Sequence, residues 1–143
     1  MRQLDVYLGE SLIGRIVENR KGGRFEYEQS IVGKLAGRPV LSMAFPAKVR
    51  PFGEAKTSAW FNGLLPEGNR RDEVCRSLGV LPYDWIGLLA EIGWECAGAV
   101  RVFEHGRERA CELRLEEIPS SELAEKLSSA TERLPQVESG LFR

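Results

Sequence analysis

Residues that could act as a nucleophile, a base or a metal ligand are few in this sequence. Its single histidine, His105, lies in a polar turn, and the three cysteines are widely spaced with no CxxC pair. Nucleophilic catalysis by serine or cysteine needs a positioned base, and a zinc site needs clustered ligands. We therefore interpret His105 as a solvated loop residue and Cys75 and Cys96 as small buried hydrophobes, and we predict no catalytic residue and no metal site.

Phosphoryl transfer would need a cradle of backbone N–H groups, a cation and metal-binding carboxylates. The sequence contains neither GxxxxGK[ST] nor GxGxxG, and its nearest glycine-rich element is Lys21-Gly22-Gly23. That element separates two runs typical of strands, which favours a hairpin turn. The acid pairs Asp72-Glu73 and Glu116-Glu117 are typical of solvated faces. We therefore expect this chain to hold no nucleotide cofactor.

The basic pair Arg70-Arg71, together with Lys48 and Arg50, could contact phosphates. Glu67 and Asp72-Glu73 surround the pair, however, which favours a helix start held by salt bridges. The formal net charge of −1 predicts no long-range attraction to nucleic acid or to an anionic membrane, although a local basic patch stays open.

A cluster of large apolar side chains, Trp60-Phe61 with Leu64-Leu65, offers the best candidate for binding another protein. At helical spacing Trp60 and Leu64 share one face, and Phe61 and Leu65 share another. Core packing is the favoured explanation of the whole cluster. The alternative is that one face, the one with Trp60, docks on another protein, since tryptophan supplies a large area and a polar handle. The candidate partner-binding residues are Trp60, Phe61, Leu64, Leu65, Glu67, Arg70 and Arg71.

The chain has 143 residues, of which 43% are hydrophobic and 29% are charged. This is the balance of a globular protein with one domain, or one domain and part of a second. No apolar run approaches the roughly 20 residues that span a bilayer, and the N-terminus lacks the apolar core of a signal peptide. With an odd number of cysteines, these features favour a cytoplasmic protein with reduced thiols.

The elements that must position these residues change type along the chain. Alternating apolar and polar residues predict strands at 3–8, 12–17 and 24–28, followed by a short helical turn at 30–37. The apolar stretch Pro39–Phe45 predicts a fourth strand, followed by a loop rich in proline and glycine.

The middle of the chain has helical signals. Thr57-Ser58 is expected to cap a helix that runs through Leu65, and a second helix at 70–78 is expected to end at Gly79. A third helix should begin at a cap formed by Asp84, and it should be closed by Gly93.

The remaining residues predict a strand at 97–103, another strand at 111–115 and a helix that opens at Ser120. The composition shifts near Glu104, which favours a boundary between residues 1–104 and a second subdomain or linker at 105–143. We predict an α+β fold, in which a small, partly barrel-like antiparallel sheet packs against three helices within residues 57–93. The strand and helix after Glu104 would form a short C-terminal extension.

Four segments in a fixed order resemble the N-terminal domain of HipA proteins, the kinases of HipA–HipB toxin–antitoxin operons. They read Pro39-Val40-Leu41-Ser42-Met43-Ala44-Phe45-Pro46, then Phe61-Asn62-Gly63-Leu64-Leu65-Pro66-Glu67-Gly68 with Arg70-Arg71, then Leu88-Leu89-Ala90-Glu91-Ile92-Gly93, then Cys96-Ala97-Gly98-Ala99-Val100. The resemblance covers about Gln3 to Phe103 and continues more weakly to the C-terminus.

The resemblance implies a non-catalytic accessory domain of a HipA-like Ser/Thr kinase toxin of a type II system. In that family the kinase core, which binds ATP and Mg, lies C-terminal to this region, and its phosphate loop, lysine and catalytic Asp are absent here. Implied partners are that kinase core, in the same or a separate chain, and a HipB-like DNA-binding antitoxin.

An alternative implied by the same family is a free-standing, antitoxin-like inhibitor of a separate HipA-type kinase. The segment Glu138–Arg143 looks like the one that precedes the kinase phosphate loop, which favours the accessory domain. The reading frame downstream of Arg143 discriminates between the two.

Overall fold

The computed structural model describes residues 1–96, 98–107 and 128. The strand predicted at 111–115 and the helix predicted from Ser120 lie outside these residues. The domain boundary predicted near Glu104 stays a prediction.

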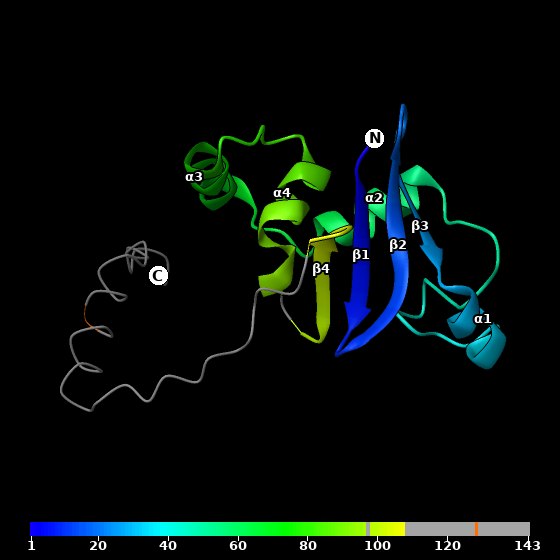
Figure 1. Ribbon diagram of the computed structural model, residues 1–143. Coiled ribbons are helices and arrows are strands. Elements are labelled where there is room, and N and C mark those ends of the chain that lie inside the picture. The colour runs from blue at the N-terminus through cyan, green and yellow to red at the C-terminus, as the bar shows by residue number, and fades with distance from the viewer. Residues whose placement is uncertain (97, 108–127, 129–143) are drawn as a thin grey trace, which may run out of the picture. The chain divides into compact units, whose positions relative to one another are not determined.

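The described residues form one four-stranded antiparallel sheet (Figure 1). Its strands are β1 (Gln3–Leu8), β2 (Ser11–Asn19), β3 (Gly22–Tyr27) and β4 (Val100–Glu104), in the spatial order β3-β2-β1-β4. The predicted α+β class and the first three strands are confirmed. The sheet is not closed, because β3 and β4 are its two edges, so the expected barrel-like closure is wrong.

The strand pairing follows from the alternation of apolar residues. Leu4 pairs with Ile16 across β1 and β2, and both side chains are fully buried on the inner face. Gly14 in β2 lies so close to β3 that an added Cβ would meet ring carbons of Phe25 at 2.7 Å. A glycine is therefore required here by the close approach of the Phe25 ring.

Within the described residues, four α-helices accompany the sheet. They are α1 (Gln29–Leu35), α2 (Glu54–Asn62), α3 (Gly68–Leu78) and α4 (Trp85–Ile92), and a 3-10 turn, η1 (Gly93–Glu95), follows α4. In Figure 1, α2 lies behind the sheet, whereas α4 lies beside β4. Helix α2 packs against β3 and helix α4 packs against β4, so these two helices supply most of the helical side of the core.

Three of the predicted helix ends are confirmed. The carboxylate of Asp84 accepts a hydrogen bond of 3.0 Å from the Gly87 N–H and so caps α4. Gly79 adopts a left-handed conformation with φ 69° after α3, which glycine reaches without a steric penalty. Gly93 ends α4 in a right-handed conformation and leads directly into η1.

The cap predicted at Thr57-Ser58 is wrong, because α2 begins earlier, at Glu54. Thr57 is fully buried inside the helix, where its hydroxyl donates to the Gly53 carbonyl (2.9 Å) and accepts from the Phe25 N–H (3.2 Å). The hydroxyl therefore joins α2 to β3 instead of starting a helix.

The fourth strand predicted at Pro39–Phe45 is also wrong. Its only ladder contact is an isolated bridge between Pro39 and Pro46, and the chain closes on itself through a bond of 2.9 Å from the Ala47 N–H to the Arg38 carbonyl. Two prolines lack the N–H groups that a ladder needs, so Leu41 and Phe45 are buried by a turn instead of a strand.

An aromatic core lies between this turn, β3 and α2. Phe25 is its centre, with ring centroids 4.8 Å from Tyr27, 5.9 Å from Phe45, 6.1 Å from Phe52 and 5.6 Å from Phe61. These rings are all buried, so they supply much of the apolar area that holds the domain together. They also fix the position of α2, which carries the candidate site.

Candidate protein-binding site

The candidate site is built where α2 ends and α3 begins. Helix α2 stops at Asn62, and the Leu64 and Leu65 N–H groups donate to the carbonyls of Phe61 and Asn62, both at 3.1 Å. This tight turn places Leu64 and Leu65 beyond the end of α2. The prediction that the helix runs through Leu65 is therefore wrong. Gly68, with φ 56°, then starts α3.

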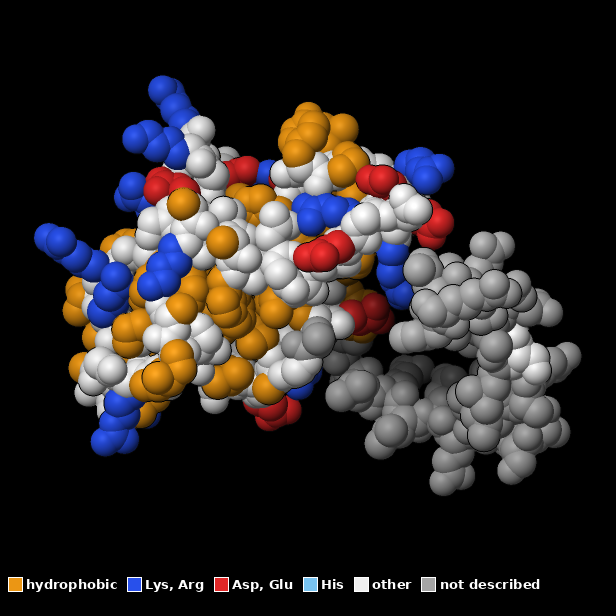
Figure 2. Space-filling view, turned by 180° about the vertical axis from the view of Figure 1, so that it is seen from behind, with side chains coloured by type: hydrophobic (Ala, Val, Ile, Leu, Met, Phe, Trp, Pro, Cys, Tyr) orange, Lys and Arg blue, Asp and Glu red, His pale blue; other side chains and the backbone are white. Residues whose placement is uncertain are grey.

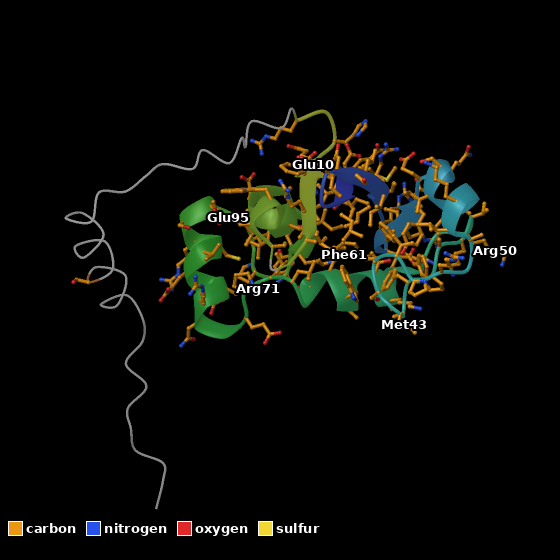
Figure 3. The ribbon with its side chains drawn as sticks, turned by 90° about the horizontal axis from the view of Figure 1, so that it is seen from below. Glu10, Met43, Arg50, Phe61, Arg71 and Glu95 are labelled. Carbon is orange, nitrogen blue, oxygen red and sulfur yellow. The ribbon has the colours of Figure 1, made fainter. Side chains whose placement is uncertain are left out.

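Arg71 joins the two helices to the loop that follows them. Its guanidinium donates from Nη1 to Asn62 Oδ1 (2.7 Å) and from Nε to the Pro82 carbonyl (2.8 Å), in the position labelled in Figure 3. The expected salt-bridged helix start is wrong for the described residues, where neither Arg70 nor Arg71 forms an ion pair. Arg71 is bound by neutral acceptors, whereas Arg70 stays exposed.

The apolar cluster divides into two pairs. Phe61 and Leu65 are buried, and the Phe61 ring lies 6.5 Å from that of Trp85 inside the core. Trp60 and Leu64 are half-buried, with the Trp60 ring packed edge-on at 4.8 Å from Phe61. Only the second pair therefore offers surface to another molecule, and its binding role stays a prediction.

A pocket of about 420 Å³ opens beside this turn, between α3, α4 and η1. Its wall is mainly apolar, and two exposed side chains of opposite charge, Arg70 and Glu95, also line it. Apolar lining with a few polar groups is typical of a surface that receives an apolar side chain. The remaining wall is formed by Leu64, Leu65, Pro66, Val74, Ile92 and Cys96.

The structure brings some of the predicted residues together and separates others. Leu64, Leu65 and Arg70 all line this pocket, which is called the α2–α3 pocket below because the turn between these helices forms part of its wall. Arg71 does not line it but binds Asn62 and the Pro82 carbonyl, and Glu67 is exposed. Asn62 was not predicted to have a role. No local sequence pattern indicates this role, because the partner of Asn62, Arg71, lies nine residues further along the chain.

The surface around the site is rich in hydrophobic side chains. Figure 2 shows them gathered over the face on which α2 lies. Tyr83 and Leu81, in the loop between α3 and α4, are 78% and 55% exposed, and Trp94 in η1 is 40% exposed. Exposed apolar area of this kind is typical of surfaces that bind other proteins.

The residues with potential for chemistry are held apart from one another. Cys75 is buried as predicted, whereas Cys96 is only half-buried, and burial raises the pKa of its thiol. His105 is exposed, but its Nδ1 lies 2.9 Å from Asp5 Oδ2, and Asp5 also accepts a bond from Arg15. Among the described residues, no three His, Cys, Asp or Glu side chains are grouped to hold a metal ion.

The fold defines a class, a small α+β domain with an open antiparallel sheet and helices over its inner face. The model of the family described as "HipA N-terminal domain" matches residues 4–103, so the chain belongs to that family. The resemblance stated for Gln3 to Phe103 is thereby confirmed.

Known proteins that are similar to this chain include a longer relative and two solved structures. "Putative kinase Y4mE" of Sinorhizobium fredii is 29% identical over 109 residues, which are 76% of this chain and 26% of that protein. The chain therefore spans about a quarter of the length of this curated relative.

The structural similarity supports the fold. The HipA, HipB and operator DNA complex of Shewanella oneidensis MR-1 contains a chain with a TM-score of 0.65 at 22% identity, matched over 87% of this chain and 29% of that one. A structure of the N-terminal domain of HipA toxin has a TM-score of 0.55 at 23% identity, with 76% of this chain and 96% of that chain covered.

The helices of the described residues are also short for a membrane protein. None of them is long and apolar enough to cross a bilayer.

Proposed function

We propose that this chain is a non-catalytic N-terminal accessory and protein-interaction domain of a HipA-like Ser/Thr protein kinase. The observation that carries the proposal is the family match over residues 4–103, which covers nearly all of the described domain. The relative named as a putative kinase is about four times longer than the region that matches this chain. The unmatched part of that relative is long enough to hold a kinase core, which supports the proposal.

The proposed partners are that kinase core and a HipB-like DNA-binding antitoxin within a type II toxin–antitoxin system. The similar fold in the Shewanella complex, which contains HipA, HipB and operator DNA, supports this assignment. We further propose a cytoplasmic location, where thiols such as those of Cys75 and Cys96 stay reduced. ATP and Mg would then be bound by the kinase core and not by this domain.

The α2–α3 pocket is the proposed contact for the kinase core. Its apolar wall would receive an apolar side chain, and Arg70 and Glu95 would orient the partner through charge. Leu64 is part of this wall, and Trp60, four residues earlier, would add a further half-buried hydrophobic side chain. Residues that are already buried, such as Phe61 and Leu65, would shape the pocket without leaving the core.

A variant of the pocket tests this contact. Replacing Val74, which is half-buried in the wall, by Asp should weaken binding to the kinase core by roughly tenfold or more, because a carboxylate would lose its hydration there. Binding is measured by isothermal titration of the 143-residue chain with a separately produced kinase core of the HipA family. Ser77→Asp, at an exposed position of the same helix, is the matched control and should bind normally.

Equal affinities of the Val74→Asp and Ser77→Asp variants would remove the pocket from the proposal. Circular dichroism of both variants establishes that the fold is intact. The reading frame downstream of Arg143 provides a further test: an in-frame kinase sequence supports the accessory domain, and a stop codon before a separate kinase gene contradicts it.

A further inference from the structure

One segment of this chain carries positively charged side chains and no negatively charged ones. Residues 29–53 contain Lys34, Arg38, Lys48 and Arg50 and no aspartate or glutamate, although the chain as a whole has a formal net charge of −1. All four side chains are exposed. Within the described part of the chain none of the four takes part in an ion pair. Residues 34–52 are called the basic loop below.

The basic loop is held in place by buried contacts. Its residues Phe45 and Phe52 are 0% and 2% exposed, and the Phe52 N–H donates to the Phe25 carbonyl at 2.7 Å. The Tyr27 hydroxyl donates to the Phe45 carbonyl and accepts from the Leu41 N–H at 3.2 Å. Because the backbone is fixed from within, a partner that binds the loop has little backbone entropy to remove.

Two lysines are positioned over one ring of the aromatic core. Lys48 Nζ lies 4.1 Å from the centroid of the Phe52 ring, and Lys56 Nζ of α2 lies 5.3 Å from the same centroid. These cation–π contacts keep both ammonium groups on one surface without neutralising them. Lys56 therefore extends the charge of the basic loop onto α2. In Figure 2, basic side chains project from this end of the molecule.

The same loop also exposes two large apolar side chains. Met43 and Val49 are 85% and 83% exposed, and Val49 lies between the cations Lys48 and Arg50. Figure 3 shows Met43 and Arg50 pointing outward from the loop. A phosphate backbone offers no partner for such side chains, whereas methionine and arginine are both enriched in protein interfaces.

We propose that the basic loop is a docking surface for an acidic protein segment that carries apolar side chains among its carboxylates. The carboxylates pair with Lys48, Lys56 and Arg50 and steer the approach. Met43 and Val49 contact the apolar side chains of the partner. The surface shares no residue with the α2–α3 pocket, so this inference does not depend on the kinase contact proposed there.

The test uses a defined probe, a synthetic peptide of about 20 residues in which glutamates alternate with leucines, at about 150 mM salt. Binding to the full chain is followed by fluorescence anisotropy and by amide NMR shifts. We expect shifts that concentrate in residues 34–56. The double variant Lys48→Glu, Arg50→Glu should bind at least tenfold more weakly, and Met43→Ser, Val49→Ser several-fold more weakly.

The matched control is Arg20→Glu, Lys21→Glu, which makes the same change of charge at the exposed turn between β2 and β3. It should lower the affinity for the peptide less than twofold, because distant surface charges are screened by salt. Equal losses in the control and the loop variant would show non-specific attraction and overturn the proposal.

A duplex DNA of about 20 base pairs is titrated in parallel. Tighter binding of DNA than of the peptide, with the same loss in Lys48→Glu, Arg50→Glu, would assign the surface to nucleic acid and refute the protein partner. The proposal is supported if the peptide binding depends on Met43 and Val49 while the DNA binding is weak and does not depend on them.

Discussion

Arg2, which directly precedes β1, joins β2 to α4 through its guanidinium group. It contacts Glu18 of β2 at 2.6 Å and Asp84, the cap of α4, at 2.7 Å. The hydrogen bonds from Arg2 are the main reason that the pKa values of Glu18 and of Asp84 lie below their ordinary range. Both carboxylates therefore stabilise the folded state only while they are ionised.

The first prediction is that Arg2 makes the stability of the domain depend on pH. Because both pKa values are lower in the folded state than in the unfolded state, the stabilisation is complete above about pH 5. It is lost as the pH falls through the lowered pKa values. Replacing Arg2 by Met should cost about 1 kcal/mol of unfolding free energy at pH 7, since these groups are partly exposed, and clearly less at pH 3. Urea denaturation at both pH values measures this, and an equal loss at both would contradict it.

The second prediction concerns Gly87, which is buried beside this ion pair. A Cβ at this position would meet the Asp84 carboxylate and would lie 2.7 Å from Arg2 Nη1. Replacing Gly87 by Ala should therefore destabilise the domain by about 1–3 kcal/mol in thermal unfolding, despite the helix preference of alanine.

Gly33 of α1 provides the matched control. It has no atom within 4 Å of an added Cβ, so Gly33→Ala should be neutral or stabilising by up to about 1 kcal/mol. Similar unfolding temperatures for the two alanine variants would show that the crowding at Gly87 has no energetic effect.

Among the elements, α2 and β3 are joined by the packing of Phe61 on Phe25 and by one buried hydroxyl, that of Thr57. The third prediction is that Thr57→Val, which keeps the shape of the side chain, costs about 1–3 kcal/mol because the Phe25 N–H loses its acceptor. Denaturant unfolding measures the loss.

The neighbouring Ser58 is the control, because Thr57 and Ser58 were both expected to cap the helix. The Ser58 hydroxyl only donates to the Ala55 carbonyl near the surface, so Ser58→Ala should change stability by less than about 0.5 kcal/mol. A larger loss in Ser58→Ala than in Thr57→Val would restore the capping role.

Elements with a clear period were predictable from the sequence, and elements fixed by distant contacts were not. The alternation in Gln3–Leu8 and the cap at Asp84 are local signals, and both appear in the structure as expected. The turn at Pro39–Phe45 depends on the Tyr27 hydroxyl and on burial of Phe45, which no local pattern reveals. An apolar run between two prolines is equally compatible with a strand and with a buried turn.

The candidate site shows the same division. Helical spacing correctly separated Trp60 and Phe61 onto different faces, and Phe61 is the buried one. The role of Arg71 was not predictable, because its acceptors on Asn62 and Pro82 are nine and eleven residues away. The acidic neighbours Glu67 and Asp72-Glu73 suggested salt bridges, but the fold places neutral oxygen atoms closer to the Arg71 guanidinium than any carboxylate of the described residues.

At the scale of the whole molecule, the domain presents two separate surfaces. The α2–α3 pocket is apolar with two charges, and the basic loop is cationic with two exposed apolar side chains. Under the two proposals above, the α2–α3 pocket would bind a kinase core while the basic loop binds a second protein.

The proposal that this domain binds proteins and not nucleotide can be tested by titrating the 143-residue chain with Mg-ATP in a calorimeter. We expect no saturable heat up to about 1 mM nucleotide, because ATP binding is proposed to belong to a kinase core outside this domain. A magnesium-dependent Kd in the micromolar range would show that the domain itself binds ATP and would refute the proposal.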